Sequence, residues 1–307
     1  MLKIILLFIS FLYLYGAEPI SPIPQESDAD IQKAELGKIL FFDPLLSRDG
    51  SVSCASCHDV FNGGADAKVV SIGYGGEKGN IQSPTVLNAV YNFKQFWNGR
   101  AKDLYEQAQG PLQNPVEHNM DIKSIEKVLN NSLLYKQKFK DVYDVSYIKF
   151  PLLIDAIVEF EKALITPNAK FDKYLRGELS LNKEEKEGYL LFKEYGCITC
   201  HNGVNVGGNS FQKMGVFFEY DTKVKYPDRY KITGNKAFIN VFKVPTLRNI
   251  SLTAPYFHDG SAKTLKEAIN TMSKYSLGVE LLDEEVEKMV QFLKILEGEL
   301  PHILERK

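Results

Sequence analysis

The sequence predicts a mainly α-helical protein built from two similar modules, one in each half of its 307 residues. Three observations predict this fold class. Apolar residues recur at helical spacing in several segments. A Cys-x-x-Cys-His motif occurs once in each half, at 54–58 and at 197–201. The stretch 84–106 recurs at 245–267 without a gap, which is typical of an internal duplication.

The first segment is a predicted export signal. Lys3 precedes an almost unbroken apolar run over 4–15, and Gly16 and Ala17 follow it. The run is short for a bilayer span and has the charge, apolar core and small-residue exit of a secretory signal. We therefore expect residues 1–17 to be removed and the mature protein to lie in the periplasm without an integral membrane span. An uncleaved membrane anchor is the alternative.

Helix signals follow along the first half. An apolar stripe marks a helix over 31–40. Pro151 is expected to open a helix that runs through Thr166, because proline suits a first helical turn and Pro167 would end the helix. The Gly-, Asn- and Ser-rich stretch 60–95 is predicted to be a loop, as is 203–240. The domain boundary is placed near Pro167, which gives an N-terminal domain over 18–167 and a C-terminal domain over 168–307.

The second half contains two predicted capping boxes. Asn182 with Glu185 precedes a helix that leads into the second Cys-x-x-Cys-His motif, and Thr264 with Glu267 opens a helix towards Met272. A last helix is expected to be capped by Asp283. The net charge of −2 gives no reason to expect nucleic acid or an anionic membrane as a partner.

All four cysteines lie in the two Cys-x-x-Cys-His motifs. Two disulfides would be the alternative in an exported protein. Cysteines at i and i+3 lie on one face of a helical turn and can reach both vinyl groups of one porphyrin, while the histidine at i+4 ligates the iron. The sequence therefore predicts two c-type haems. The attachment residues are Cys54 and Cys57 with the ligand His58, and Cys197 and Cys200 with the ligand His201.

The repeat relates the surroundings of the two motifs. Pro-Thr-Val-Leu-Asn at 84–88 recurs as Pro-Thr-Leu-Arg-Asn at 245–249, and Phe-Trp-Asn-Gly at 96–99 aligns with Phe-His-Asp-Gly at 257–260, always 161 positions apart. We interpret this as two cytochrome c-like domains, each around one covalent haem, related by internal duplication.

The two haems are predicted to differ. Met272 is a candidate sixth ligand for the second haem, since thioether sulfur is a common axial ligand, although core packing would also suit a methionine. The matching position in the first half is Pro111, which cannot ligate iron. The first haem is therefore expected to keep an open position for a small molecule. His118 or Met120 as its sixth ligand is the alternative.

Glu117 and Gln107 are candidate catalytic residues of the first half. A carboxylate over an open haem could move a proton between the two oxygens of peroxide, and an amide could orient it. Alone, each would more often be a solvated surface residue. Trp97, the only tryptophan, is a candidate electron relay because the repeat places it where the modules would face each other. His258 aligns with Trp97 and is expected near a haem or the domain interface.

Several stretches resemble the bacterial di-haem cytochrome c peroxidases, a family that includes MauG-like enzymes. They are 41–47, 83–88, 95–101 and 252–260. The resemblance implies that a small periplasmic donor, a monohaem cytochrome c or a cupredoxin, reduces the C-terminal haem. Electrons would pass by way of Trp97 to the N-terminal haem, where hydrogen peroxide is reduced to water. It also implies a homodimer and one calcium ion near Gln82 and the backbone carbonyls of Thr253 and Pro255.

Two positions depart from the family pattern. Tyr74 stands where many members have a histidine that caps the resting iron, and Gln82 replaces the usual asparagine at the calcium site. We expect Tyr74 to leave the iron free, although ligation as phenolate is the alternative. A peroxidase that needs little or no reductive activation is the resulting hypothesis.

Two other functions remain open at this point. One is a MauG-like enzyme that oxidises a protein side chain, against which Met272 argues because MauG-like proteins have tyrosine there. The other is a di-haem electron carrier or sensor, which would require a tight sixth ligand on both irons.

Overall fold

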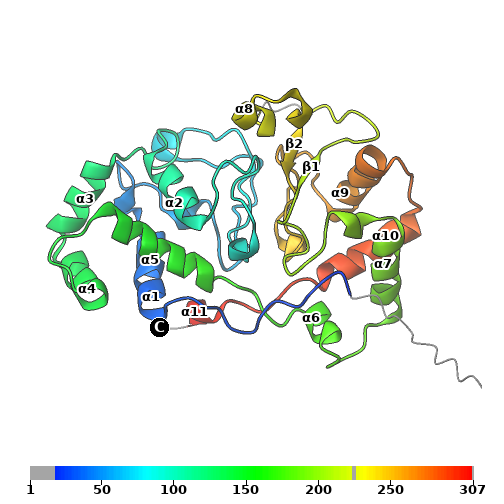
Figure 1. The fold of residues 1–307 in the computed structure, drawn as a ribbon, viewed down its shortest axis with the longest axis horizontal. Coiled ribbons are helices and arrows are strands. Elements are labelled where there is room, and N and C mark those ends of the chain that lie inside the picture. The colour runs from blue at the N-terminus through cyan, green and yellow to red at the C-terminus, as the bar shows by residue number, and fades with distance from the viewer. Residues whose placement is uncertain (1–17, 223–225, 306–307) are drawn as a thin grey trace, which may run out of the picture.

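The computed structural model describes residues 18–222 and 226–305, so the predicted export signal lies outside the described residues. Two helical halves lie side by side (Figure 1). In the described ranges the strands are confined to one antiparallel pair, β1 (Phe211–Lys213) and β2 (Val241–Lys243). The prediction of a mainly α-helical protein is confirmed. No helix within these ranges has the length and apolar character needed to cross a membrane.

The helices fall into the two halves in chain order. The first half contains α1 (Ile31–Phe42), α2 (Leu104–Gln113), α3 (Ile122–Asn131), α4 (Leu133–Tyr143) and α5 (Phe150–Ala163). The second half contains α6 (Lys170–Leu175), α7 (Lys183–Glu194), α8 (Arg229–Thr233), α9 (Leu265–Met272) and α10 (Asp283–Lys294), and α11 (His302–Glu305) follows.

The capping predictions are largely confirmed. Asn182 with Glu185 and Thr264 with Glu267 form capping boxes before α7 and α9. The prediction for Asp283 is wrong, because Leu282 is the N-cap of α10 and its N–H is satisfied by Glu285 Oε2 at 2.8 Å.

Two further helix predictions need correction, one in where the helix ends and one in its place in the chain. Helix α5 ends at Ala163 rather than Thr166, since the Thr166 N–H donates to Asn88 Oδ1 at 2.8 Å and not to the helix. Helix α10 is also not the last helix, because the short α11 follows it.

In each half the two long helices cross at a glycine. A Cβ on Gly37 of α1 would lie 1.9 Å from the Ala156 carbonyl oxygen of α5. A Cβ on Gly188 of α7 would lie 2.0 Å from the Lys288 carbonyl oxygen of α10. The absence of a side chain therefore lets the helix backbones touch. The same close contact at a glycine occurs in both halves.

Replacing Gly188 by Ala is expected to destabilise the protein by about 1–3 kcal/mol, the usual cost of forcing an extra methyl group into a packed contact. Urea unfolding of the variant measures this loss. Gly110→Ala is the matched control, because Gly110 also lies in a helix but its Cβ would meet Phe96 at an ordinary 3.5 Å. Equal unfolding midpoints for Gly188→Ala and the wild type would contradict the close crossing.

The sequence repeat is accompanied by a repeat of backbone conformation. Asn88 and Asn249 both adopt left-handed conformations, with φ of 59° and 56°. The bridge between Gln95 and Ala101 recurs as a bridge between Tyr256 and Ala262. Helices α2 and α9 also begin at matching positions, so the two stretches share their turns as well as their residues.

The ends of the described chain cross between the halves. Ile20 pairs with Gly203 and belongs to the apolar core of the second half. Ile303 of α11 packs in a core cluster with Ala34 and Phe41 of α1. Figure 1 shows both crossings, with the N-terminal segment reaching the second half and α11 lying beside α1.

Candidate functional site

The two Cys-x-x-Cys-His motifs have the same local structure. Each forms one 3₁₀ turn, Cys54–Ser56 and Cys197–Thr199. The N–H of Cys57 donates to the Cys54 carbonyl at 3.2 Å, and Cys200 donates to Cys197 over the same distance. All four cysteines are free thiols. The turn holds both sulfurs of a motif close to its histidine, as attachment of one porphyrin requires.

Both motif histidines are held in the form that binds iron. Nδ1 of His58 donates to the Gly64 carbonyl at 3.2 Å, and Nδ1 of His201 donates to the Val206 carbonyl at 3.3 Å. A carbonyl only accepts, so the proton lies on Nδ1 and the lone pair on Nε2. Burial lowers the pKa of both imidazoles, that of His201 to about 4. Both rings are thus neutral with Nε2 available to a metal.

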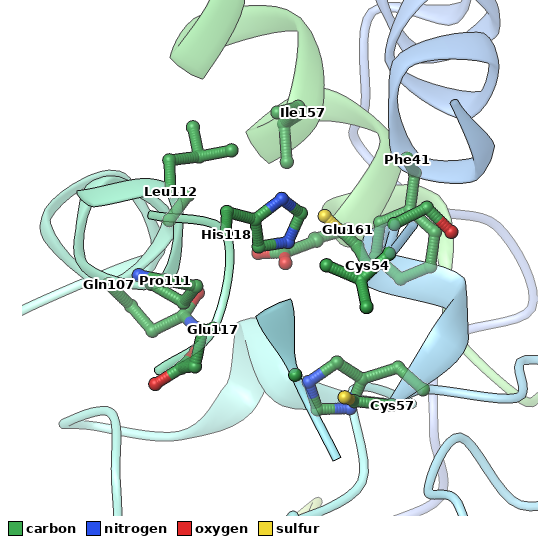
Figure 2. Close-up of a pocket in the computed structure, with 15 residues that line it drawn as sticks. Phe41, Cys54, Cys57, Gln107, Pro111, Leu112, Glu117, His118, Ile157 and Glu161 are labelled. Carbon is green, nitrogen blue, oxygen red and sulfur yellow. The ribbon is translucent and has the colours of Figure 1, made fainter. Parts of the chain in front are cut away.

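A pocket opens beside the first motif (Figure 2). Its wall combines the first motif with apolar side chains and a few polar groups. The residues that matter here are Cys54, Cys57, His58, Phe41, Leu112 and Ile157, with the polar Gln107, Glu117, His118 and Glu161. Two free sulfurs, a neutral imidazole and apolar walls fit a c-type haem.

Glu117 and Gln107 line this same pocket, so the structure brings both predicted catalytic residues together with His58. In Figure 2 both side chains lie across the pocket from Cys54. Asn114 Nδ2 donates to the Glu117 carboxylate. Burial nevertheless raises the pKa of Glu117 above its ordinary value. The Glu117 carboxyl group is thus partly buried, and the Asn114 amide holds it in place.

The loop with Tyr74 packs against the turn that carries Glu117. The Tyr74 N–H donates to the Glu117 carbonyl at 2.8 Å, and a Cβ on Gly73 would lie 2.0 Å from the Val116 carbonyl oxygen. Gly73 lines the pocket, whereas Tyr74 is absent from the lining residues. The loop therefore reaches the site through backbone rather than through the tyrosine ring.

His118 and Met120, the two other ligand candidates, lie in different surroundings. His118 lines the pocket, and its Nδ1 donates to the Leu46 carbonyl at 3.0 Å, while burial lowers its pKa. Met120 packs in the apolar core of the first half and does not line the pocket. Pro111 lines the pocket at the position that matches Met272.

Sequence reasoning missed Glu161. It lies on α5, lines the pocket, and has one buried carboxylate oxygen that finds no hydrogen-bond partner in the described part of the chain. Burial raises the pKa of Glu161 to about 8. The available signal was its spacing from Ile154, Ile157 and Leu164, which puts a charged residue on the apolar face of a helix.

Met272 ends α9 and is followed by a π-helical turn, Ser273–Leu277. Such turns occur often at functional sites. The Met272 sulfur accepts from Ser276 Oγ at 4.0 Å, and the side chain is half-buried. Near the second motif, the Phe192 ring lies 6.4 Å from the His201 ring, measured between centroids.

Aromatic rings connect the two halves. Trp97 of the first half meets the His258 ring edge-on with centroids 6.1 Å apart, and Phe242 stacks on His258 at 4.3 Å. His258 is buried, and its Nε2 has no partner among the described residues. His258 thus contacts Trp97 of the first half and Phe242 of the second.

The predicted calcium ligands lie beside these rings. Trp97 Nε1 donates to the Gln82 carbonyl at 2.9 Å, and the Gln82 N–H donates to the His258 carbonyl at 3.0 Å. Gln82 and Thr253 are both buried, and a cis peptide bond precedes Pro255. The Gln82 side-chain amide makes no hydrogen bond within the described ranges, so its oxygen is free to meet a hard cation. Clusters of three or more His, Cys, Asp or Glu that could hold a metal do not occur in those ranges.

Comparison with known proteins gives consistent matches. Residues 31–180 match the family model described as di-haem cytochrome c peroxidase. The chain is 50% identical to a cytochrome c551 peroxidase of Nitrosomonas europaea, over 92% of this chain and 85% of that protein. It is 44% identical to the cytochrome c peroxidase of Escherichia coli, over 92% of this chain but only 61% of that longer protein. A crystal structure of a MauG-like protein associated with microbial copper homeostasis superposes with a TM-score of 0.81, 27% identity and coverage of 94% and 95%.

Proposed function

The chain belongs to the di-haem cytochrome c peroxidase and MauG family, and on this premise we propose that it is a periplasmic peroxidase that reduces hydrogen peroxide to water. Membership implies two haems, peroxide as substrate and a redox partner as electron donor. The observation that carries the proposal is the pocket in which His58, Glu117 and Gln107 meet. Each turnover consumes one peroxide, two electrons and two protons and gives two waters.

Each residue of the pocket has its own role in the proposed reaction. Cys54 and Cys57 would anchor the haem, and His58 would ligate its iron through Nε2. When bound, the haem supplies the metal that accepts electrons and passes them to peroxide. Glu117 takes a proton from one peroxide oxygen and returns a proton to the other, which leaves as water. Gln107 orients peroxide through its amide.

The raised pKa of Glu117 suits this exchange, because a carboxyl group that titrates closer to neutral pH both accepts and releases a proton readily. Asn114 fixes the carboxylate in one orientation. The apolar side chains Phe41, Leu112 and Ile157 exclude bulk water from the reacting atoms.

Electrons enter at the second haem in this proposal. Cys197 and Cys200 would anchor it, and His201 and Met272 would hold its iron, which would leave no position there for peroxide. Trp97 relays electrons to the first haem, with the rings of His258 and Phe242 packed against it. A monohaem cytochrome c or a cupredoxin is the donor.

The remaining parts of the proposal concern organisation. Residues 1–17 are an export signal, 18–167 form the peroxidatic haem domain and 168–307 the electron-transfer haem domain, derived from one duplicated cytochrome c-like ancestor. The matching turns of the two halves support the duplication. Gln82, with the carbonyls of Thr253 and Pro255, holds one calcium ion, and the protein is a homodimer.

Mixing the fully oxidised protein with peroxide tests the function. Because Tyr74 does not line the pocket, we expect a high-spin band in the resting spectrum, a rapid change in the Soret band and turnover with reduced cytochrome c. A Soret band that changes only after one electron has been added would contradict an open first haem. Two low-spin haems without turnover would instead indicate an electron carrier.

A further inference from the structure

Lys243 is a buried residue whose ammonium group has no partner in the part of the chain that the structure describes. The residue is 6% exposed and lies at the end of β2. Within residues 18–222 and 226–305 its ammonium group makes no hydrogen bond and no ion pair. Arg248, a cation buried to a similar degree in the same half, is paired with Asp172 at 2.6 Å. Among the residues described, Arg248 thus has a carboxylate partner and Lys243 has none.

The position of Lys243 lies between the two candidate haem sites. The backbone N–H of Lys243 donates to the Trp97 carbonyl of the first half at 2.7 Å. Two residues further, the Pro245 carbonyl would meet a Cβ on Gly207 at 2.2 Å, and that same Cβ would lie 3.4 Å from Nδ1 of His201. The strand therefore leads from the tryptophan directly to the second motif.

The side chain of Lys243 leaves β2 on a defined face. Phe242 stacks on His258, so its ring fills one face of the strand. Successive side chains of a strand point to opposite faces, and Lys243 therefore points away from His258. Phe211 stands opposite Lys243 in the register and packs against Phe93 of the first half. Lys243 thus points into the space between the halves.

A buried ammonium group needs an anion. Taking it out of water without a partner is costly, and burial alone lowers the pKa of Lys243 to about 8, which leaves the group mostly charged at neutral pH. A c-type haem brings two propionate carboxylates on the edge opposite its thioether bonds. We infer that Lys243 forms an ion pair with a propionate of one of the two haems. The inference rests on the proposed haems but not on the peroxidase reaction.

Lys243→Met in the haem-loaded protein tests this pair by spectroelectrochemical titration of both haems. A cation beside a propionate disfavours the ferric form, so its loss should lower the midpoint potential of that haem. For a unit charge about 10 Å from the iron at an effective dielectric constant of about 20, the reduction equilibrium should fall roughly tenfold, or about 59 mV for one electron. The haem whose midpoint potential falls is the one whose propionate pairs with Lys243.

Two controls make the result specific. Lys243→Arg keeps the positive charge and should keep both potentials close to the wild type. Lys213→Met removes an exposed lysine from the paired strand β1 and should move neither potential. Lys243→Gln is a second variant for the case in which the methionine variant fails to take up haem. Unchanged potentials of both haems in a haem-loaded Met or Gln variant would overturn the inference, whether or not the protein reduces peroxide.

Discussion

Replacing Glu117 by Gln is expected to lower kcat for peroxide reduction by about 10²–10⁴-fold, the range that a positioned general acid–base group contributes. Glutamine has nearly the same shape and keeps a hydrogen-bonding contact with Asn114, but it neither accepts nor returns a proton. The haem content and the resting spectrum should stay unchanged, because Glu117 is not a predicted axial ligand. Steady-state kinetics with a reduced cytochrome c measure the loss.

Glu77→Gln is the matched control. Glu77 is an exposed carboxylate on the same loop as Tyr74, and it should retain the wild-type rate. The pH profile gives a second readout. Because burial raises the pKa of Glu117, the base form disappears as the pH falls through this raised value, and the wild-type rate should fall with it. Glu117→Gln should lack this acidic limb. A variant with a rate within a few-fold of the wild type would place the proton transfer on another group.

Replacing Arg248 by Met is expected to destabilise the protein by about 3–5 kcal/mol, the usual cost of leaving one member of a buried ion pair alone. Arg248 and Asp172 are both fully buried and lie 2.6 Å apart. Arg248 also donates to the carbonyls of Val204 and Ser21 at 3.0 and 2.9 Å. The substitution therefore leaves a carboxylate and two carbonyl groups without their donor. Urea unfolding of the haem-loaded protein measures the change.

The double variant Arg248→Met with Asp172→Leu separates charge from packing. Removing both charges should recover most of the loss, because apolar pairs of similar volume often replace buried ion pairs at little cost. The first half offers a natural precedent, since the position that matches Arg248 in the repeat is the buried Leu87. If Arg248→Met alone kept its free energy of unfolding within about 1 kcal/mol of the wild type, the Asp172 carboxylate would have to be solvated. That result would contradict the usual cost of breaking a buried ion pair.

The sequence predicted features that depend on nearby residues. The turns of the Cys-x-x-Cys-His motifs and the capping boxes at Asn182 and Thr264 involve positions three or four apart, so spacing alone was sufficient. The pocket that joins Gln107 and Glu117 to His58 was predicted through the repeat and the family resemblance, because nothing local connects these residues.

Features set by distant contacts were not predicted. Helix α5 ends early because Asn88, far away in the sequence, binds the Thr166 N–H. Lys243 appears in the sequence as an ordinary charged residue, and Glu161 is distinguished only by its place on the apolar face of a helix. The packing of other elements around them is what removes both from water. Single-sequence periodicity contains no information on which distant segment will cover a given side chain.

The exchange of chain ends determines how this molecule can be divided and in what order it is completed. A fragment that stopped at Pro167 would lack Ile303, which packs in one core cluster with Phe41. A fragment that began at Asn168 would lack Ile20 and the Ser21 carbonyl that Arg248 binds. Neither fragment is a finished unit. The interior of the first half is therefore complete only when the last residues of the chain have folded against it.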